Sequence, residues 1–281
     1  MESQLMYFKN ITFNRLSAVI PFIFVLLFTS TQSHAAENSS KSVLENIYQS
    51  QINSYYSING FYNFSANQGA QKDLEDINAS LTTMAELFNA IQGETDSGET
   101  SEQFEAVAAA WKAYQKVLKQ NVREVEKTGY PDLRLAGDMA TNNIALNAAL
   151  SGLYDAIQAG ASIKPSKTTQ LSRDTATNLA LMMTKYSART TSTVSQVYAG
   201  GDVDKEVTID SLAEEFGKQL QELMAMAEGK QTSFKLLDSA NTKWDFIKNS
   251  YVNYNENRVN FIVNLYSKKI INDIEQALET M

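Results

Sequence analysis

The sequence has no cysteine, and its single histidine, His34, lies close to the N-terminus. A chain whose body lacks both residues cannot build a thiolate or imidazole metal site, a Ser-His-Asp triad, a cysteine nucleophile or a histidine-ligated haem. It also contains no glycine-rich phosphate loop and no nucleophile elbow. We therefore predict a protein that is not an enzyme and that binds no metal or cofactor.

Glycine and proline are scarce, at 12 and 3 residues in 281, which disfavours an all-β or disordered chain. The hydrophobic fraction of 43% is ample for a buried core. The formal net charge of −8 argues against nucleic acid and anionic membrane surfaces as partners. An exported chain of this size without cysteine is more typical of a bacterial periplasm than of a eukaryotic exterior.

The N-terminal segment has the organisation of a cleavable signal peptide. Lys9 and Arg15 precede a 13-residue apolar run, which is shorter than the roughly 20 residues that a spanning helix needs. Ser33 and Ala35 supply small residues at the −3 and −1 positions, so we predict cleavage after Ala35 and a periplasmic or secreted product. An uncleaved anchor is the alternative. After cleavage we expect no membrane span.

Along the rest of the chain, apolar residues recur at spacings of three and four, the pattern of helices with one buried face. The segment YYSINGFYNFS at residues 55–65 is aromatic and β-branched enough to suit a strand as well, and we favour a helix because its neighbours are helical. Expected helices cover roughly 42–67, 71–92, 101–127, 132–159, 168–198 and 256–278, after a polar leader at 37–41. Between the last two, one helix carries the stripe from Ile209 to Leu223, a short break follows at 229–232, and the helix with Trp244 comes after it.

The only two tryptophans, Trp111 and Trp244, lie 133 positions apart with apolar residues at matching offsets. In the helices before them, Ile77, Met84, Phe88 and Ile91 match Ile209, Phe216, Leu220 and Leu223 at an offset of 132. This register predicts an all-α fold of two tandem up-and-down four-helix bundles that arose by internal duplication, with the tryptophans as core anchors. The expected divisions are a signal peptide at 1–35 and bundles at 36–160 and 168–281. The rival interpretation is that any two four-helix bundles give similar patterns, and the orientation of the bundles stays open.

Arg189 is the candidate anchor for a ligand, because its helix is otherwise poor in charge and places Tyr186 and Thr190 beside it. A guanidinium there can form a forked pair with a carboxylate or oxyanion, which predicts a small anionic ligand. Tyr55 and Tyr62, with Tyr48 on the same helical face, can line a pocket in the first unit. The alternative for Arg189 is an interhelical salt bridge or a position on the surface. The alternative for the tyrosines is packing in the core.

Each half of the chain shows a glycine turn, a stripe containing phenylalanine, a helix with a central tryptophan and a last apolar helix with asparagine. The residues that carry this pattern are Gly69, Phe88 and Trp111 in the first half and Gly201, Phe216 and Trp244 in the second. The pattern resembles the PilJ-type helical domain, which forms the N-terminal region of type IV pili methyl-accepting chemotaxis transducers and related periplasmic sensors. In such domains an arginine-rich run lies in the first helix, and Arg189 is the residue here that matches it.

The resemblance implies a periplasmic module that binds a small ligand, or a membrane-bound or periplasmic protein partner, and serves signalling or type IV pilus and surface behaviour. The alternative is a structural or surface-assembly protein that presents a helical interface to other proteins. A secreted helical effector is the third interpretation, which lacks an apolar hairpin capable of insertion.

Overall fold

The computed structural model describes residues 20–95, 100–160, 164–190, 208–253 and 259–281, and within these ranges the protein is all-helical, with eight helices and no strand. The helices are α1 (Ile20–Ala66), α2 (Gln71–Thr95), α3 (Ser101–Thr128), α4 (Leu133–Gly160), α5 (Lys167–Thr190), α7 (Ile209–Met226), α8 (Gln231–Val252) and α9 (Asn260–Glu279). None of the helices in the described ranges is both long and apolar enough to span a membrane.

Most helix boundaries agree with the periodicity, and residues 55–65 are helical, which excludes the strand interpretation. The start of the first helix was predicted wrongly. It begins at Ile20 rather than near Ser42, and the expected polar leader belongs to it. No proline or glycine interrupts the chain between Pro21 and Gly60, so nothing in the sequence stops the helix there. The predicted cleavage after Ala35 falls within α1 and stays a prediction.

Other predicted boundaries fall partly outside the described residues. The helix expected over 168–198 is described up to Thr190, and the glycine turn at Gly201 lies beyond the described part. The matching turn at Gly69 is described: its φ is +86°, and its N–H donates to the Phe64 carbonyl at 2.8 Å. Glycine adopts this left-handed conformation readily, and it closes the C-terminus of α1.

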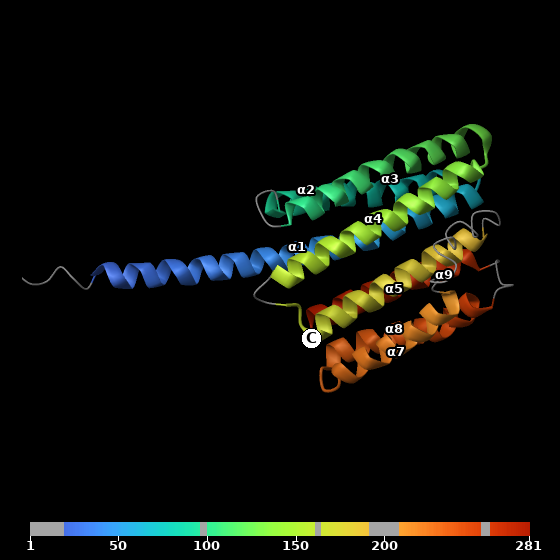
Figure 1. Cartoon of the computed structure of the whole chain (residues 1–281). Helices are drawn as coiled ribbons and strands as arrows, with labels where there is room; N and C mark the ends of the chain where they lie inside the picture. Colours follow the sequence, from blue (N-terminus) through green and yellow to red (C-terminus); the bar gives the residue numbers. More distant parts are fainter. Residues whose placement is uncertain (1–19, 96–99, 161–163, 191–207, 254–258) are drawn as a thin grey trace, which may run out of the picture.

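The helices are arranged as two neighbouring sets (Figure 1). In the first, α1 packs on α2 and α4, and α3 packs on α4; in the second, α5 packs on α7 and α9, and α8 packs on α9. The sets meet where α1 lies against α5. The N-terminal part of α1 projects beyond the other helices.

Two hydrophobic cores lie within this arrangement, and α1 contributes to both. Ile47, Phe61 and Tyr62 of α1 belong to the core of the first helix set. Tyr48 and Ile52, on another face of the same helix, belong to the core of the second set. The proposed division at 160–168 therefore separates helices that share one buried element, and the duplication itself stays a prediction.

Each tryptophan packs against a phenylalanine of the helix before it. Trp111 of α3 is half-buried and stacks on Phe88 of α2, with ring centroids 5.1 Å apart. Trp244 of α8 is buried and meets Phe216 of α7 edge-on at 4.6 Å. The two phenylalanines are 128 positions apart, so this pairing differs by one helical turn from the offset of 132 in the sequence alignment.

A buried polar network joins α1, α5 and α9. Asn59 donates to Ser187 Oγ at 2.7 Å and to Asn264 Oδ1 at 3.1 Å. Asn63 accepts from Asn260 at 2.7 Å and from Asn264 at 3.1 Å. Because buried amides are costly unless their hydrogen bonds are made, this network favours one register of the three helices over its alternatives.

Candidate functional site

The predicted anchor Arg189 lies in the last turn of α5, and its side chain reaches the C-terminal end of α8. It is 7% exposed, and its guanidinium donates to the carbonyls of Ser250 at 3.2 Å and Tyr251 at 3.5 Å. Its Cζ lies 4.8 Å from the ring centroid of Tyr186, so the structure does bring these two predicted residues together. Cations commonly satisfy the last carbonyls of a helix in this way. These contacts give Arg189 a structural role in closing α8.

Of the other predicted ligand residues, Tyr55 belongs to the same core as Tyr186, in the second helix set, whereas Tyr62 belongs to the core of the first set. Burial raises the pKa of both phenols well above the usual value. The Tyr62 hydroxyl has no hydrogen-bond partner among the described residues. The side chain of Thr190 lies outside the described part of the chain.

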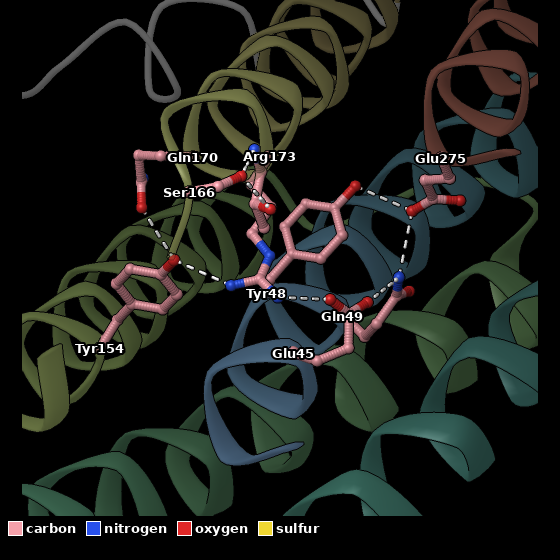
Figure 2. Close-up of polar contacts among 9 residues, drawn as sticks. Glu45, Tyr48, Gln49, Tyr154, Ser166, Gln170, Arg173 and Glu275 are labelled. Atoms are coloured by element: carbon pink, nitrogen blue, oxygen red, sulfur yellow. Dashed lines mark hydrogen bonds and ion pairs between the residues drawn. The ribbon is translucent and has the colours of Figure 1, made fainter. Parts of the chain in front are cut away.

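A second arginine of α5, Arg173, occupies a different kind of position. The Ser166 hydroxyl caps α5 by accepting from the Thr169 N–H at 3.0 Å, and Arg173 follows within the first two turns. From there its side chain reaches between α1 and α4 (Figure 2). Arg173 donates to Glu45 Oε2 at 2.6 Å and to the Tyr154 hydroxyl at 3.0 Å.

Arg173 is only 8% exposed, although it carries a full charge. Its Cζ lies 5.7 Å from the Tyr48 ring centroid and 5.9 Å from that of Tyr154, so two aromatic rings flank the guanidinium. Such contacts attract a cation electrostatically. Its Nε, however, has no hydrogen-bond partner among the described residues. Glu45 and Tyr154 therefore accept hydrogen bonds from the terminal nitrogens of the guanidinium, and the buried Nε–H is left without an acceptor among the described residues.

Glu275 of α9 forms the opposite side of this cluster (Figure 2). Its Oε1 accepts from the Tyr48 hydroxyl at 2.8 Å and from Gln49 Nε2 at 3.1 Å. Gln49 also donates to Glu45 at 3.0 Å, which links the two carboxylates. Burial, and then the charges of Glu45 and Glu279, raise the pKa of Glu275 above its ordinary value.

Two cavities flank Arg173 and Tyr48, and both residues line each of them. One, of about 330 Å³, is further lined by Gln51, Ser151, Tyr154, Asp155, Gln170, Asp174 and Thr177. The other, of about 340 Å³, is further lined by Glu45, Gln49, Ser172, Ile274, Glu275, Leu278 and Glu279. In the first cavity, burial is the main cause that raises the pKa of Asp174. Between helices, small cavities with a few convergent polar groups are the usual form of a ligand site.

The groups gathered here are able to form hydrogen bonds and charge pairs with a bound molecule. Arg173 and the amides and hydroxyls around it offer hydrogen bonds, and five carboxylates line the two cavities. In the part of the chain that the structure describes, no group of three or more acidic residues is placed to hold a metal ion.

Arg173 was not among the residues predicted from the sequence. It lies in QLSRD among ordinary polar residues, while its main partner, Glu45, lies 128 positions earlier. Tyr48 was the one member of the site that helical periodicity had marked.

Comparisons with known proteins gave no match: no family model, no curated protein and no solved structure is similar to this chain. The fold and the site define an all-helical protein with a polar cluster where α1, α4, α5 and α9 meet.

Proposed function

We propose that this protein is a non-enzymatic helical binding module and that its ligand occupies the cavities beside Arg173. The observation that carries the proposal is a guanidinium 8% exposed, which lines two cavities and keeps one N–H without an acceptor. Taking a guanidinium out of water costs several kcal/mol, on the order of the effective penalty per buried ion. Its contacts with Glu45 and Tyr154 offset part of that cost, and a ligand acceptor would satisfy the N–H that they leave unpaired.

The wider proposal concerns export and ancestry. The basic N-terminus, apolar run and Ser33/Ala35 pattern support an exported protein with cleavage after Ala35. The matching apolar positions around Trp111 and Trp244 in the sequence support a duplicated unit similar to PilJ-type sensor domains, in service of signalling or type IV pilus and surface behaviour. Fractionation followed by N-terminal sequencing tests the first part: a mature N-terminus at Ala36 supports it, and a cytosolic full-length chain refutes it.

The binding function is tested by native mass spectrometry of the purified protein, followed by identification of small molecules released on denaturation. The variant Arg173→Met removes the guanidinium donors of the site while it keeps an unbranched side chain. Lys167→Met is the matched control, because Lys167 is exposed and its ion pair with Glu222 lies on the protein surface. A ligand that is retained by the control and absent from Arg173→Met supports the proposal. Equal retention by both variants contradicts this site.

A second candidate function rests on exposed aromatic residues of α8 and α9. Phe246 is 66% exposed and Phe261 is 72% exposed, and the Phe246 ring lies 5.3 Å from that of Tyr266. Exposed apolar groups of this size favour a protein interface. A structural or surface-assembly protein would use such a face. Loss of self-association or of partner crosslinking in Phe246→Ser/Phe261→Ser would support it, and unchanged behaviour would not.

A further inference from the structure

The cavity beside Glu275 holds more negative than positive charge. Glu45, Glu275 and Glu279 line it, and Arg173 is the only basic residue in its lining. Glu45 is neutralised by its contact with Arg173 at 2.6 Å. Two carboxylates are therefore left without a positive partner in the cavity lining. Because like charges in a partly buried site repel one another, a cation in the cavity would lower the electrostatic energy.

Glu275 is the carboxylate that gains most from such a cation. Its two donors, the Tyr48 hydroxyl and the Gln49 amide, are neutral, and both bond to Oε1. Charged donors make hydrogen bonds to a carboxylate that are about twice as strong as those of neutral donors. An ammonium group at Oε2 would supply the charged donor that the described residues do not provide.

The buried Arg173 Nε gives a separate indication of what the ligand offers. Its N–H has no acceptor among the described residues, although Arg173 is more than nine-tenths buried. A buried donor without an acceptor costs about 1–3 kcal/mol, so a ligand oxygen that accepts from it is favoured. Ile274 and Leu278 provide apolar wall in the same cavity, suited to a short methylene chain.

We propose that this cavity binds a small ammonium compound that also carries an oxygen acceptor, with the ammonium on Glu275 and the oxygen toward Arg173. The inference rests on the proposed binding function and adds the chemical class of the ligand. The volume of about 340 Å³ lies at the lower end of the range of ligand pockets and suits a molecule of amino-alcohol or amino-acid size.

Four probes of similar size separate the charge from the acceptor: 3-amino-1-propanol, propylamine, 3-hydroxypropionate and 1,3-propanediol. Each is titrated calorimetrically into the full protein up to roughly 10 mM, which saturates a site of millimolar affinity. We expect 3-amino-1-propanol to bind most tightly, propylamine several-fold more weakly, and the other two not measurably.

Variants then assign the contacts. Glu275→Gln keeps the acceptor for Tyr48 and Gln49 but removes the charge, and should weaken 3-amino-1-propanol by at least about tenfold. Glu214→Gln, on the exposed face of α7, is the matched control and should leave the affinity unchanged. Arg173→Lys removes the Nε donor and should reduce the preference for 3-amino-1-propanol over propylamine.

The outcomes distinguish the two levels of the proposal. Binding of 3-hydroxypropionate or 1,3-propanediol alone, lost in Arg173→Met, overturns the ammonium inference and leaves the binding function standing. Amine binding that Glu275→Gln does not weaken also overturns the inference. If no probe binds, the ammonium inference fails, and the retained-ligand experiment on Arg173→Met then decides the binding function by itself.

Discussion

The contact between Arg173 and Glu45 can be tested by a double-mutant cycle. Arg173→Met removes the guanidinium and keeps much of the apolar side-chain volume, and Glu45→Gln removes the charge and keeps an acceptor oxygen. The wild type, the two single variants and the double variant give the coupling energy between the side chains, free of what each variant does elsewhere.

The structure sets the expected magnitude. A hydrogen bond to a charged group contributes about 1.5–3 kcal/mol in a protected setting. Arg173 has such a setting, with a side chain 10% exposed, whereas the Glu45 side chain is 44% exposed and is screened by solvent. Measured exposed pairs couple by about 0.2–1 kcal/mol. We therefore expect a coupling energy of about 1–1.5 kcal/mol, between the exposed and the protected case.

The single variant Arg173→Met should cost somewhat more, about 1–2.5 kcal/mol. It also loses the two tyrosine contacts, each of which contributes about 0.5–1 kcal/mol at a partly solvated site. Relief of the guanidinium from burial offsets part of that loss. Tyr154 keeps a partner, because its hydroxyl still donates to Gln170 at 2.9 Å.

Equilibrium unfolding in urea measures all four proteins, and equal m-values would show that the variants change stability rather than the unfolding transition itself. A coupling energy below roughly 0.3 kcal/mol would refute the reasoning, since it is within the additivity expected of independent sites.

Three further predictions test the fold. Asn59→Leu should destabilise by about 2–4 kcal/mol, because it leaves several buried partners of the polar network unpaired; the exposed Asn78→Leu is its control, and an equal effect of both in urea contradicts the account. The melting temperature of Glu275→Gln minus that of the wild type should increase as the pH rises from about 4 to 7. The pKa of this carboxyl is raised in the folded state, so its stabilising contribution is present below the ordinary pKa and lost as pH rises through the raised one; a difference independent of pH contradicts this sign. Gly69→Ala should lower the free energy of unfolding by about 1 kcal/mol because the φ of Gly69 is +86°. Gly152→Ala, inside α4 with open space around it, should raise the free energy of unfolding by about 0.5–1 kcal/mol. A shift of the melting temperature in the same direction for both variants would refute this reasoning.

The helices could be predicted because their signal is local. Stripes such as Ile77, Met84 and Phe88 bury one face, and the hydrophobic pattern alone places them. The start of α1 could not be placed, because an apolar run typical of a signal peptide can also form a helix and nothing in the sequence breaks the helix.

The candidate site was harder to predict, since its signal is not local. Arg173 and Arg189 lie on the same helix, and both are buried. Arg189 stands out in sequence because its neighbours are uncharged, yet it caps α8 through backbone carbonyls, which no side-chain pattern encodes. Arg173 stands out only once the fold brings Glu45 and Tyr154 to it. A single sequence contains no spacing rule for contacts of that kind.

The shared helix α1 also imposes an order on folding. During synthesis α1 emerges before the other described helices, and most of the first core can close when α4 is complete. The face of α1 that carries Tyr48, Ile52 and Tyr55 then stays exposed until the helices of the second set are made. These helices begin more than a hundred residues after Tyr55 in the sequence. A nascent chain stopped near residue 160 would thus expose an apolar face of α1, the kind of surface that chaperones bind.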